Sequence, residues 1–237
     1  MVVESFDPSA GVYAFQFQDM DTALHSHPAI EILFAEKGYF RLATTQILHG
    51  QVSFAVINSN VPHRVFAPSG SFRVLMIEHR DRAIQPVLAQ WGLELKANIY
   101  THIGIAFTLA DFQELSAQLQ ALEPDHHYDS RVQAVLAYLQ QHEVPYESML
   151  PTLTNLVHLS ESRLSHLFKA QKGLSLKKYL LWCRLRSAIS THLDHQEGLF
   201  PALIKSGFYD QPHFSRAFKT MLGVKPSVAY NSRTVQL

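Results

Sequence analysis

Two segments in the C-terminal part of the sequence combine apolar residues at helical spacing with basic and hydroxyl side chains between them. Leu164 and Phe168 are four residues apart in the first segment, and Phe214 and Phe218 are four apart in the second, so each pair faces one side of an expected helix. The second segment repeats the first at an offset of about 51 residues. The side chains on the opposite sides are suited to contacting DNA base edges and phosphates. They are Ser160, Ser162, Arg163, Ser165, His166 and Lys169, followed by Gln211, His213, Ser215, Arg216 and Lys219.

A long helix is expected between the two segments, over residues 175–193. At about 1.5 Å per residue it spans roughly 28 Å, which is comparable to the ~34 Å between successive major grooves of B-DNA. Ser160 is expected to cap the helix of the first segment, so that the N-terminus of this helix points at the groove or at a phosphate. The repeat therefore predicts a protein that reads one DNA duplex twice.

The charge distribution agrees with this interpretation, although the net charge of the chain is zero. Residues 1–130 carry seven basic and fourteen acidic side chains, a net of −7, whereas residues 131–237 carry thirteen basic and six acidic ones, a net of +7. An acidic half joined to a basic half is typical of a protein in which one domain meets phosphate. Two ordinary domains with scattered charge are the alternative.

The composition predicts a globular protein of one or two domains, since 47% of its 237 residues are hydrophobic. Cys183 is the only cysteine, which rules out an intrachain disulfide and fits a cytosolic protein. The sequence has no apolar run near the ~18 residues of a membrane span, and its start lacks the basic and apolar regions of a signal peptide. We therefore expect a soluble, cytoplasmic protein with no membrane partner.

A second set of candidate site residues lies near the N-terminus. His25 and His27 are two residues apart, so in a strand their imidazoles point to the same side. The run from His25 to Glu31, followed by Gly38, is similar to the first metal motif of the cupin superfamily, and His63 stands where the second cupin motif has its last ligand. Three imidazoles and one carboxylate can hold a divalent transition metal. The alternative is that His25, His27, Glu31 and His63 line a pocket for an organic effector without a metal.

The N-terminal part of the chain has the pattern of short strands separated by turns. Closely spaced strands without helices between them predict an antiparallel sandwich or a small barrel over residues 12–78. The expected strands include 31–35, 39–43, 51–57 and 72–77.

Helical patterns begin after Arg80, with expected helices over 84–91 and 111–122, the second of them capped by Asp111. The apolar seam of this second helix suits either a helix of a partner subunit or the chain's own sandwich. The seam consists of Phe112, Leu115, Leu119 and Leu122. Further helices are expected over 131–142, 152–158, 160–171, 175–193, 199–206, 211–221 and 226–231.

An ordered set of motifs extends from Arg131 to Tyr230. It comprises Leu164 to Lys169, Gly173, Tyr179, Arg184-Leu185-x2-Ala188, Gly207-Phe208-x-Asp210, Phe214-x-Arg216-x-Phe218-Lys219 and Gly223-x-Lys225-Pro226-x3-Tyr230. This set resembles the DNA-binding domain of the AraC/XylS family of bacterial transcription regulators. The resemblance implies seven helices in two helix-turn-helix units and a dimerisation role for the apolar seam. It implies base contacts by Ser162, Ser165, His166, Gln211, His213 and Arg216.

The expected fold class is α+β with two domains, an N-terminal cupin-like antiparallel β-sandwich or barrel and a C-terminal all-α domain with two helix-turn-helix units. We expect a sensor domain at 1–80, a helical linker and dimerisation segment at 81–124, and the DNA-binding domain at 125–237. The resemblance implies a transcription regulator, not an enzyme, that binds promoter DNA and a small-molecule effector as a homodimer. The alternative is a metal-dependent cupin enzyme with an accessory helical domain.

Overall fold

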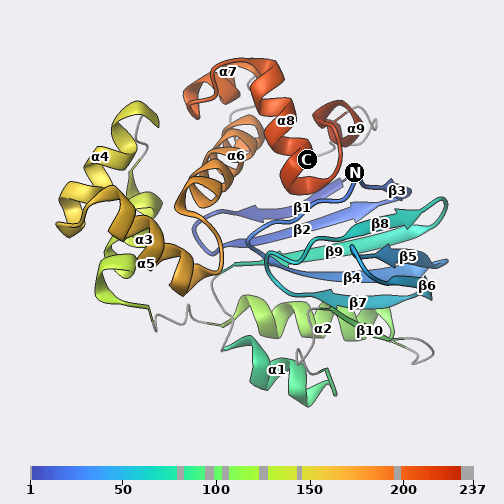
Figure 1. Cartoon of the computed structure of the whole chain (residues 1–237). Helices are drawn as coiled ribbons and strands as arrows, with labels where there is room; N and C mark the ends of the chain where they lie inside the picture. The colour runs from blue at the N-terminus through green and yellow to red at the C-terminus, as the bar shows by residue number, and fades with distance from the viewer. Residues whose placement is uncertain are drawn as a thin grey trace. The chain divides into compact units, whose positions relative to one another are not determined.

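The computed structural model describes residues 2–78, 83–93, 99–102, 107–122, 128–142, 146–194 and 199–230. Contacts divide the chain into two compact units, the first formed by Met1–Asp125 with Phe218–Leu237 and the second by His126–Ala217. The elements in chain order (Figure 1) are β1 (Val2–Asp7), β2 (Val12–Phe17), β3 (Met20–Asp21), β4 (Ile30–Lys37), β5 (Phe40–Ala43), β6 (Leu48–Val52), β7 (Phe54–Ile57), β8 (Arg64–Ala67), β9 (Ser71–Ile77), α1 (Ile84–Gln90), β10 (Ile99–His102), α2 (Leu109–Gln120), α3 (Ser130–Gln141), α4 (Tyr146–Val157), α5 (Glu161–Lys172), α6 (Leu176–Asp194), α7 (Leu199–Lys205), α8 (Gln211–Leu222) and α9 (Pro226–Tyr230).

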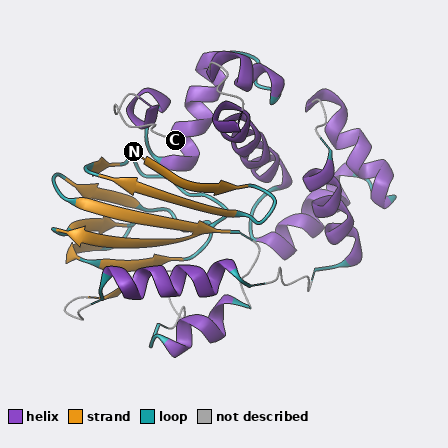
Figure 2. Ribbon diagram, turned by 180° about the vertical axis from the view of Figure 1, so that it is seen from behind, coloured by secondary structure: helices purple, strands orange, loops and turns teal. Residues whose placement is uncertain are grey.

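Two antiparallel sheets form the β part of the first unit, and Figure 2 shows their strands in orange. The larger sheet has the strand order β1-β2-β9-β4-β7-β10, and the smaller one has the order β3-β8-β5-β6. The predicted antiparallel β domain followed by a helical domain is therefore confirmed. The strand expected over 51–57 is instead interrupted at Ser53, so that β6 and β7 belong to different sheets. Gln51 has a φ of 55° next to this break, and such local left-handed backbone is typical where a strand bends or bulges.

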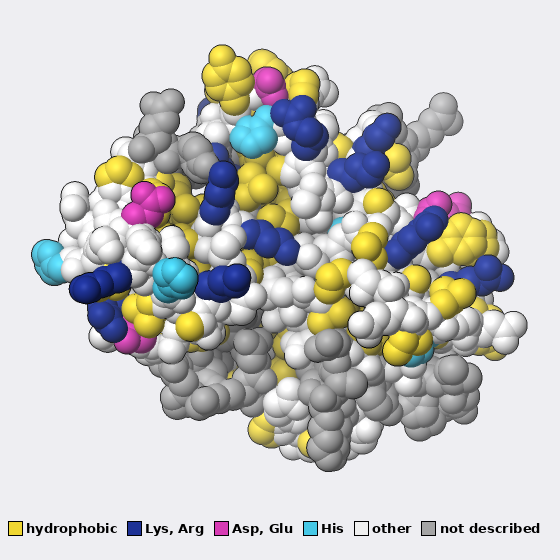
Figure 3. All heavy atoms as spheres, in the orientation of Figure 1, with side chains coloured by type: hydrophobic (Ala, Val, Ile, Leu, Met, Phe, Trp, Pro, Cys, Tyr) yellow, Lys and Arg dark blue, Asp and Glu magenta, His cyan; other side chains and the backbone are white. Residues whose placement is uncertain are grey.

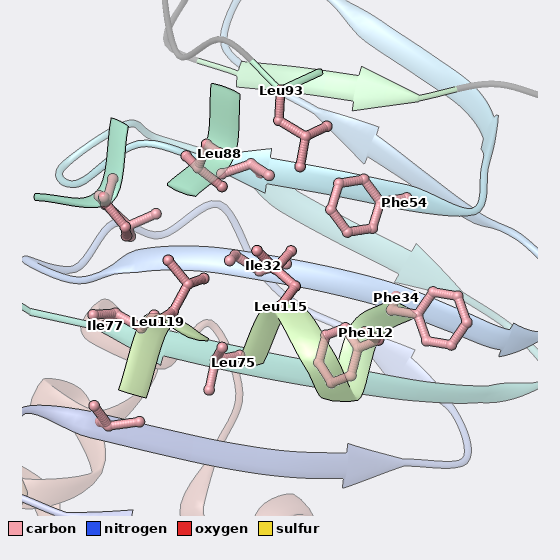
Figure 4. Packing of buried hydrophobic residues seen from close by; sticks show 14 residues of the cluster. Ile32, Phe34, Phe54, Leu75, Ile77, Leu88, Leu93, Phe112, Leu115 and Leu119 are labelled. Atoms are coloured by element: carbon pink, nitrogen blue, oxygen red, sulfur yellow. The ribbon is translucent and has the colours of Figure 1, made fainter. Parts of the chain in front are cut away.

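The main core of the first unit lies between the larger sheet and the helices α1 and α2 (Figure 4). Phe34 of β4 points toward Phe112 of α2, and the two rings stack at a centroid distance of 5.5 Å. Leu115 and Leu119 of α2 are also fully buried in this cluster. Burying one such side chain contributes roughly 1.5–3 kcal/mol. Of the two alternatives for the apolar seam, the structure therefore has it packed on the sandwich of its own chain.

The segment expected as a helical linker, 81–124, contributes a strand as well as helices. β10 pairs with β7 in antiparallel register, with Tyr100 opposite Val56 and Thr101 opposite Ala55. The division of the chain by contacts places this whole segment in the first unit. The helix α2 begins after Thr108 rather than Asp111, because Thr108 and Asp111 form a reciprocal capping box. The predicted interdomain residues His126 and His127 lie outside the described residues.

The second unit is built from helices whose positions agree closely with the sequence pattern. The buried side chains of α3 to α6 form one cluster that includes Val135, Leu153, Leu164, Phe168 and Tyr179. The expected start of α4 at residue 152 is wrong, since the helix begins at Tyr146 and Pro151 lies inside it. Among the described helices, none has the length and apolar character that crossing a bilayer requires.

Candidate nucleic-acid interface and buried histidine site

The helix α5 is fixed at both ends by residues that its sequence supplies. Ser160 is the N-cap, with an extended backbone, and its hydroxyl accepts a hydrogen bond from the Arg163 N–H at 3.4 Å. Gly173 ends the helix in a left-handed conformation, with a φ of 72°. Leu164 and Phe168 are completely buried, which fixes the rotation of the helix about its axis. The predicted cap and the predicted inward face are both present.

The helix α8 repeats this construction. The Asp210 carboxylate accepts a hydrogen bond from the His213 N–H at 2.6 Å, as an N-cap residue does. Phe214 is buried edge-on against the ring of Phe208 at 5.1 Å, and Gly223 ends the helix with a φ of 74°. Capping residue and terminal glycine both recur 50 residues after Ser160 and Gly173. The repeat therefore aligns Ser160 with Asp210, within one residue of the expected offset of about 51, and Asp210 was not among the predicted site residues.

The side chains predicted to contact DNA all remain accessible on α5 and α8, which we call the reading helices. Figure 3 shows Lys and Arg side chains distributed over the helical part of the visible face. Half-buried positions are Ser165, His213 and Ser215. Exposed positions are Ser160, Ser162, Arg163, His166, Lys169, Gln211, Arg216 and Lys219. Their contacts with DNA stay a prediction.

The four polar residues predicted near the N-terminus come together in the interior of the first unit; we call them the histidine site. Glu31 alternates with Ile30 and Ile32 of β4, whose side chains join the core with α1 and α2, so Glu31 points away from these helices. His25 and His63 form an isolated antiparallel bridge, with both N–H···O distances 2.9 Å. The exposed fractions of His25, His27, Glu31 and His63 are 7%, 2%, 5% and 1%.

The site is closely packed around one carboxylate oxygen. Nε2 of His27 lies 2.7 Å and Nε2 of His63 lies 3.1 Å from Oε2 of Glu31. One donor atom from each of the four residues can be chosen so that all lie within 4.8 Å of one another. Three imidazole nitrogens and a carboxylate oxygen are a donor set suited to a divalent transition metal, so the residues present fit the predicted ion.

The Nδ1 atoms of the three histidines all face backbone carbonyl oxygens. The distances are 2.9 Å from His25 to Ala23, 3.0 Å from His27 to Ala29 and 2.8 Å from His63 to Val61. A ring nitrogen next to a carbonyl carries the hydrogen, because the carbonyl can only accept. Nδ1 is therefore the protonated nitrogen of each ring. The sequence motif contains no signal for these second partners, since they are backbone atoms.

Burial and mutual charge perturb the ionisation of the site. Desolvation, together with the neighbouring His63 and His27, lowers the pKa of His25 to about 3. Burial alone would raise the pKa of Glu31, but the facing His63 and His27 outweigh it and hold this pKa well below its usual value. Burial likewise opposes the charged form of His63, and the Glu31 carboxylate nevertheless raises the pKa of this histidine.

The end of α8 contacts the strand segment that carries His25, and both belong to the first unit. The Ala23 N–H donates to the carbonyl oxygen of Gly223 at 2.7 Å. A Cβ placed on Gly223 would lie 2.6 Å from Nδ1 of His25 and 2.6 Å from Cβ of Thr22. Only glycine fits here, both because of the positive φ and because of this close approach. Ala23 was not among the predicted site residues, because a contact across 200 positions has no local pattern.

Comparison with known proteins shows which family this chain belongs to. A family model described as a helix-turn-helix domain matches residues 153–231, which contain both reading helices. Over 170 residues, 69% of this chain, the sequence is 31% identical to the arabinose operon regulatory protein of Escherichia coli. The chain belongs to the AraC/XylS family. This AraC-family chain spans 56% of the length of that relative.

Two further similarities extend over most of this AraC-family chain. The probable transcriptional regulator LumQ of Photobacterium leiognathi is 24% identical over 227 residues, which are 86% of this chain and 89% of LumQ. The crystal structure of ToxT from Vibrio cholerae has a TM-score of 0.60 at 10% identity, covering 95% of this chain and 98% of ToxT. Another ToxT structure, with a TM-score of 0.53, contains a bound unsaturated fatty acid. At such identities the similarity to ToxT is one of fold.

Proposed function

We propose that this AraC-family protein is a transcription regulator that binds promoter DNA through its two reading helices and a small ligand through its N-terminal unit. The observation that carries the proposal is the repeat itself. Two capped helices of equal length bury their aromatic residues and leave basic, hydroxyl and amide side chains accessible at equivalent positions. Such helices are the elements that enter the major groove in helix-turn-helix proteins.

The accessible side chains divide into two groups by their chemistry. Arg216 and His166 occupy equivalent positions of the repeat, and Arg in particular can donate two hydrogen bonds to a guanine edge. Lys169 and Lys219, one turn closer to the C-terminus of each helix, are suited to phosphate contacts. The remaining base contacts are proposed for Ser162, Ser165, Gln211 and His213.

The helix α6 lies between the two reading helices in the chain. It extends over Leu176–Asp194, 19 residues, and therefore spans roughly 28 Å. Successive major grooves of B-DNA are about 34 Å apart. We propose that the reading helices occupy neighbouring grooves and that two copies of the chain bind together, as the arabinose operon regulator's family implies.

The N-terminal unit is proposed to be the sensor, and the histidine site is proposed as the place where its ligand acts. This resembles ToxT in architecture, for which a complex with a fatty acid is known. A ligand that binds one conformation of the sensor more tightly shifts the population toward that conformation. The proposed effect on transcription needs no catalysis.

A metal-dependent cupin enzyme is the second candidate, and the donor set of the histidine site favours it. A catalytic metal, however, keeps a coordination position open to substrate. Here all four side chains are at least 93% buried, since the most exposed of them, His25, has an exposed fraction of 7%. We therefore place this candidate second.

A binding assay with the full chain and its own upstream promoter DNA tests the proposal. Arg216→Ala and His166→Ala are expected to weaken specific binding by about 10- to 100-fold, since one good base contact is worth about 1–3 kcal/mol. Lys219→Ala is expected to weaken binding to all sequences alike. It should also reduce the slope of log affinity against log salt concentration by about one. Arg41→Ala, an exposed arginine of β5, is the control. Equal affinity for promoter and unrelated DNA would overturn the proposal.

A further inference from the structure

Nε2 of His27 and Nε2 of His63 both face the buried Glu31 carboxylate, and this arrangement needs a positive charge, which a second proton on one ring or a metal ion supplies. In each ring Nδ1 faces a backbone carbonyl, so a neutral imidazole carries its single hydrogen there and presents a lone pair on Nε2. For His27 and His63 this lone pair lies 2.7 Å and 3.1 Å from a carboxylate oxygen, which is also an acceptor. Acceptors that face one another in a buried site require a shared positive charge between them.

A metal ion satisfies all of these groups at once, because imidazole lone pairs and carboxylate oxygens are its ligands. The carbonyls of Ala23, Ala29 and Val61 then act as the outer partners that orient ligating histidines in metal proteins. With bonds of about 2.1 Å, two ligand atoms of a four-coordinate ion are about 3.4 Å apart. The donor atoms lie within 4.8 Å of one another. The widest pair would therefore need to approach by at most about 1.4 Å on binding.

One ligand of this site is connected to the end of the second reading helix through a single peptide unit. The carbonyl of Ala23 accepts from Nδ1 of His25 at 2.9 Å, while the N–H of Ala23 donates to the carbonyl of Gly223 at 2.7 Å. Gly223 is the residue that terminates α8. A change in the position of the His25 ring therefore reaches Gly223 through two consecutive hydrogen bonds.

The cupin resemblance implies that His25, His27, Glu31 and His63 hold one divalent first-row transition metal ion. We propose that this ion orders the end of α8 through Ala23 and Gly223. The regulatory part of this inference rests on the proposed function of α8 in DNA binding. Since all four residues are buried, such an ion would act as a bound signal or a structural element.

Metal content and titration of the full chain test the first part. Purified protein is stripped with a chelator and titrated with Zn²⁺ and with Co²⁺, whose visible spectrum reports the coordination geometry. We expect one equivalent per chain in four-coordinate geometry, and an affinity at least about a hundred-fold lower in Glu31→Gln. His49→Gln changes a half-buried histidine outside the site and is expected to bind like the wild type. Uptake of no metal, or equal uptake by Glu31→Gln, would overturn the proposal.

The second part is tested by a residue that is remote in sequence from all four ligands. Gly223→Ala places a methyl group 2.6 Å from Nδ1 of His25, so the ring must move. The metal affinity is expected to fall at least about ten-fold, the size of effect typical for an outer partner of a ligand. Gly92→Ala is the matched control, because Gly92 has nearly the same φ, 71°, with nothing within 4 Å of its Cβ position. Equal metal affinities for the two variants would exclude the connection.

Amide hydrogen exchange of the wild type gives a measurement that does not depend on a variant. Metal is expected to slow exchange at the amides of Ala23 and Gly223 by at least about ten-fold and to leave the amide of Gly173, which ends α5, unchanged. The same slowing at all three amides, or at none, would contradict the proposed path.

The two proposals fail in different ways. If the metal site is wrong, Glu31→Gln and wild type will contain equally little metal while the wild type still selects its promoter. If DNA binding is wrong, Arg216→Ala and wild type will bind promoter and unrelated DNA alike, while each still takes up one equivalent of Zn²⁺.

Discussion

The reading helices α5 and α8 have the same kind of N-terminal cap, buried face and terminal glycine, but the surroundings of the two glycines differ. Each has 12 residues, an N-terminal capping side chain, a buried aromatic face and a left-handed terminal glycine. Gly173 at the end of α5 is exposed, whereas Gly223 at the end of α8 is buried against Thr22, Ala23 and His25. A repeated sequence thus provides two helices with similar accessible side chains, and the end of the second helix touches residues around the histidine site. The difference suggests that the two helices share recognition but not regulation.

The largest expected effect comes from removing the buried aromatic side chains that both helices have. Phe168→Ala and Phe214→Ala each remove a fully buried ring, and such truncations cost about 3–5 kcal/mol in the free energy of unfolding. Urea unfolding followed by circular dichroism measures both losses. If one variant were as stable as the wild type, the equivalence of the two helices would not hold.

Metal removal is expected to have the next largest effect on stability. Of the two helix ends, it should affect the end of α8 and not the end of α5. An ion at about a hundred times its Kd contributes about 2.7 kcal/mol to the stability of the unit that binds it. For a chain of this size we expect the melting temperature to drop by about 5–10 °C on chelation. Calorimetry with and without Zn²⁺ measures the shift. The Glu31→Gln variant should melt at the same temperature in both conditions.

Substitution of the terminal glycines compares the helix ends directly. Gly173→Ala is expected to destabilise by about 1–2 kcal/mol, because alanine is strained at positive φ. Gly223→Ala has the same strain and an additional clash with Thr22 and His25, so its loss should exceed about 2 kcal/mol. Denaturant unfolding of both variants gives the difference. Equal losses would mean that Gly223 has no more restrictive surroundings than Gly173.

The smallest expected effect concerns the two capping residues. The Asp210 carboxylate accepts at 2.6 Å and the Ser160 hydroxyl at 3.4 Å. We therefore expect Asp210→Ala to cost about 1–2 kcal/mol and Ser160→Ala about 0.5 kcal/mol. Thermal unfolding resolves the two, with Asp210→Asn as a control that keeps the accepting oxygen. A larger loss for Ser160→Ala would reverse this ranking.

The helical half could be predicted well from the sequence, because its signals are local. The spacing of Leu164 and Phe168, or of Phe214 and Phe218, fixes a helix and its buried face without reference to the rest of the chain. The exceptions have local causes too. The start of α4 was expected at residue 152, although the helix begins at Tyr146 and continues through Pro151. The cap of α2 was assigned to Asp111, although Thr108 supplies it.

The β part and the histidine site were predicted less completely, because their contacts are remote in sequence. The four site residues were found by their types and spacing, and the structure brings all four together. The strand β10 was missed because its pairing with β7 depends on residues more than 40 positions away. The link between Ala23 and Gly223 joins two backbone groups, and no residue type reports such a contact.

The way α2 is used inside the chain also restricts how a second copy of the protein can attach to it. Its apolar side, formed by Phe112, Leu115 and Leu119, is enclosed by the larger sheet. On the outer side, the Gln118 amide group accepts from the Trp91 indole N–H and donates to Glu114. A subunit that pairs along α2 would consequently meet amides and carboxylates. Association through such a surface depends on hydrogen bonds and ionic strength rather than on the burial of apolar side chains.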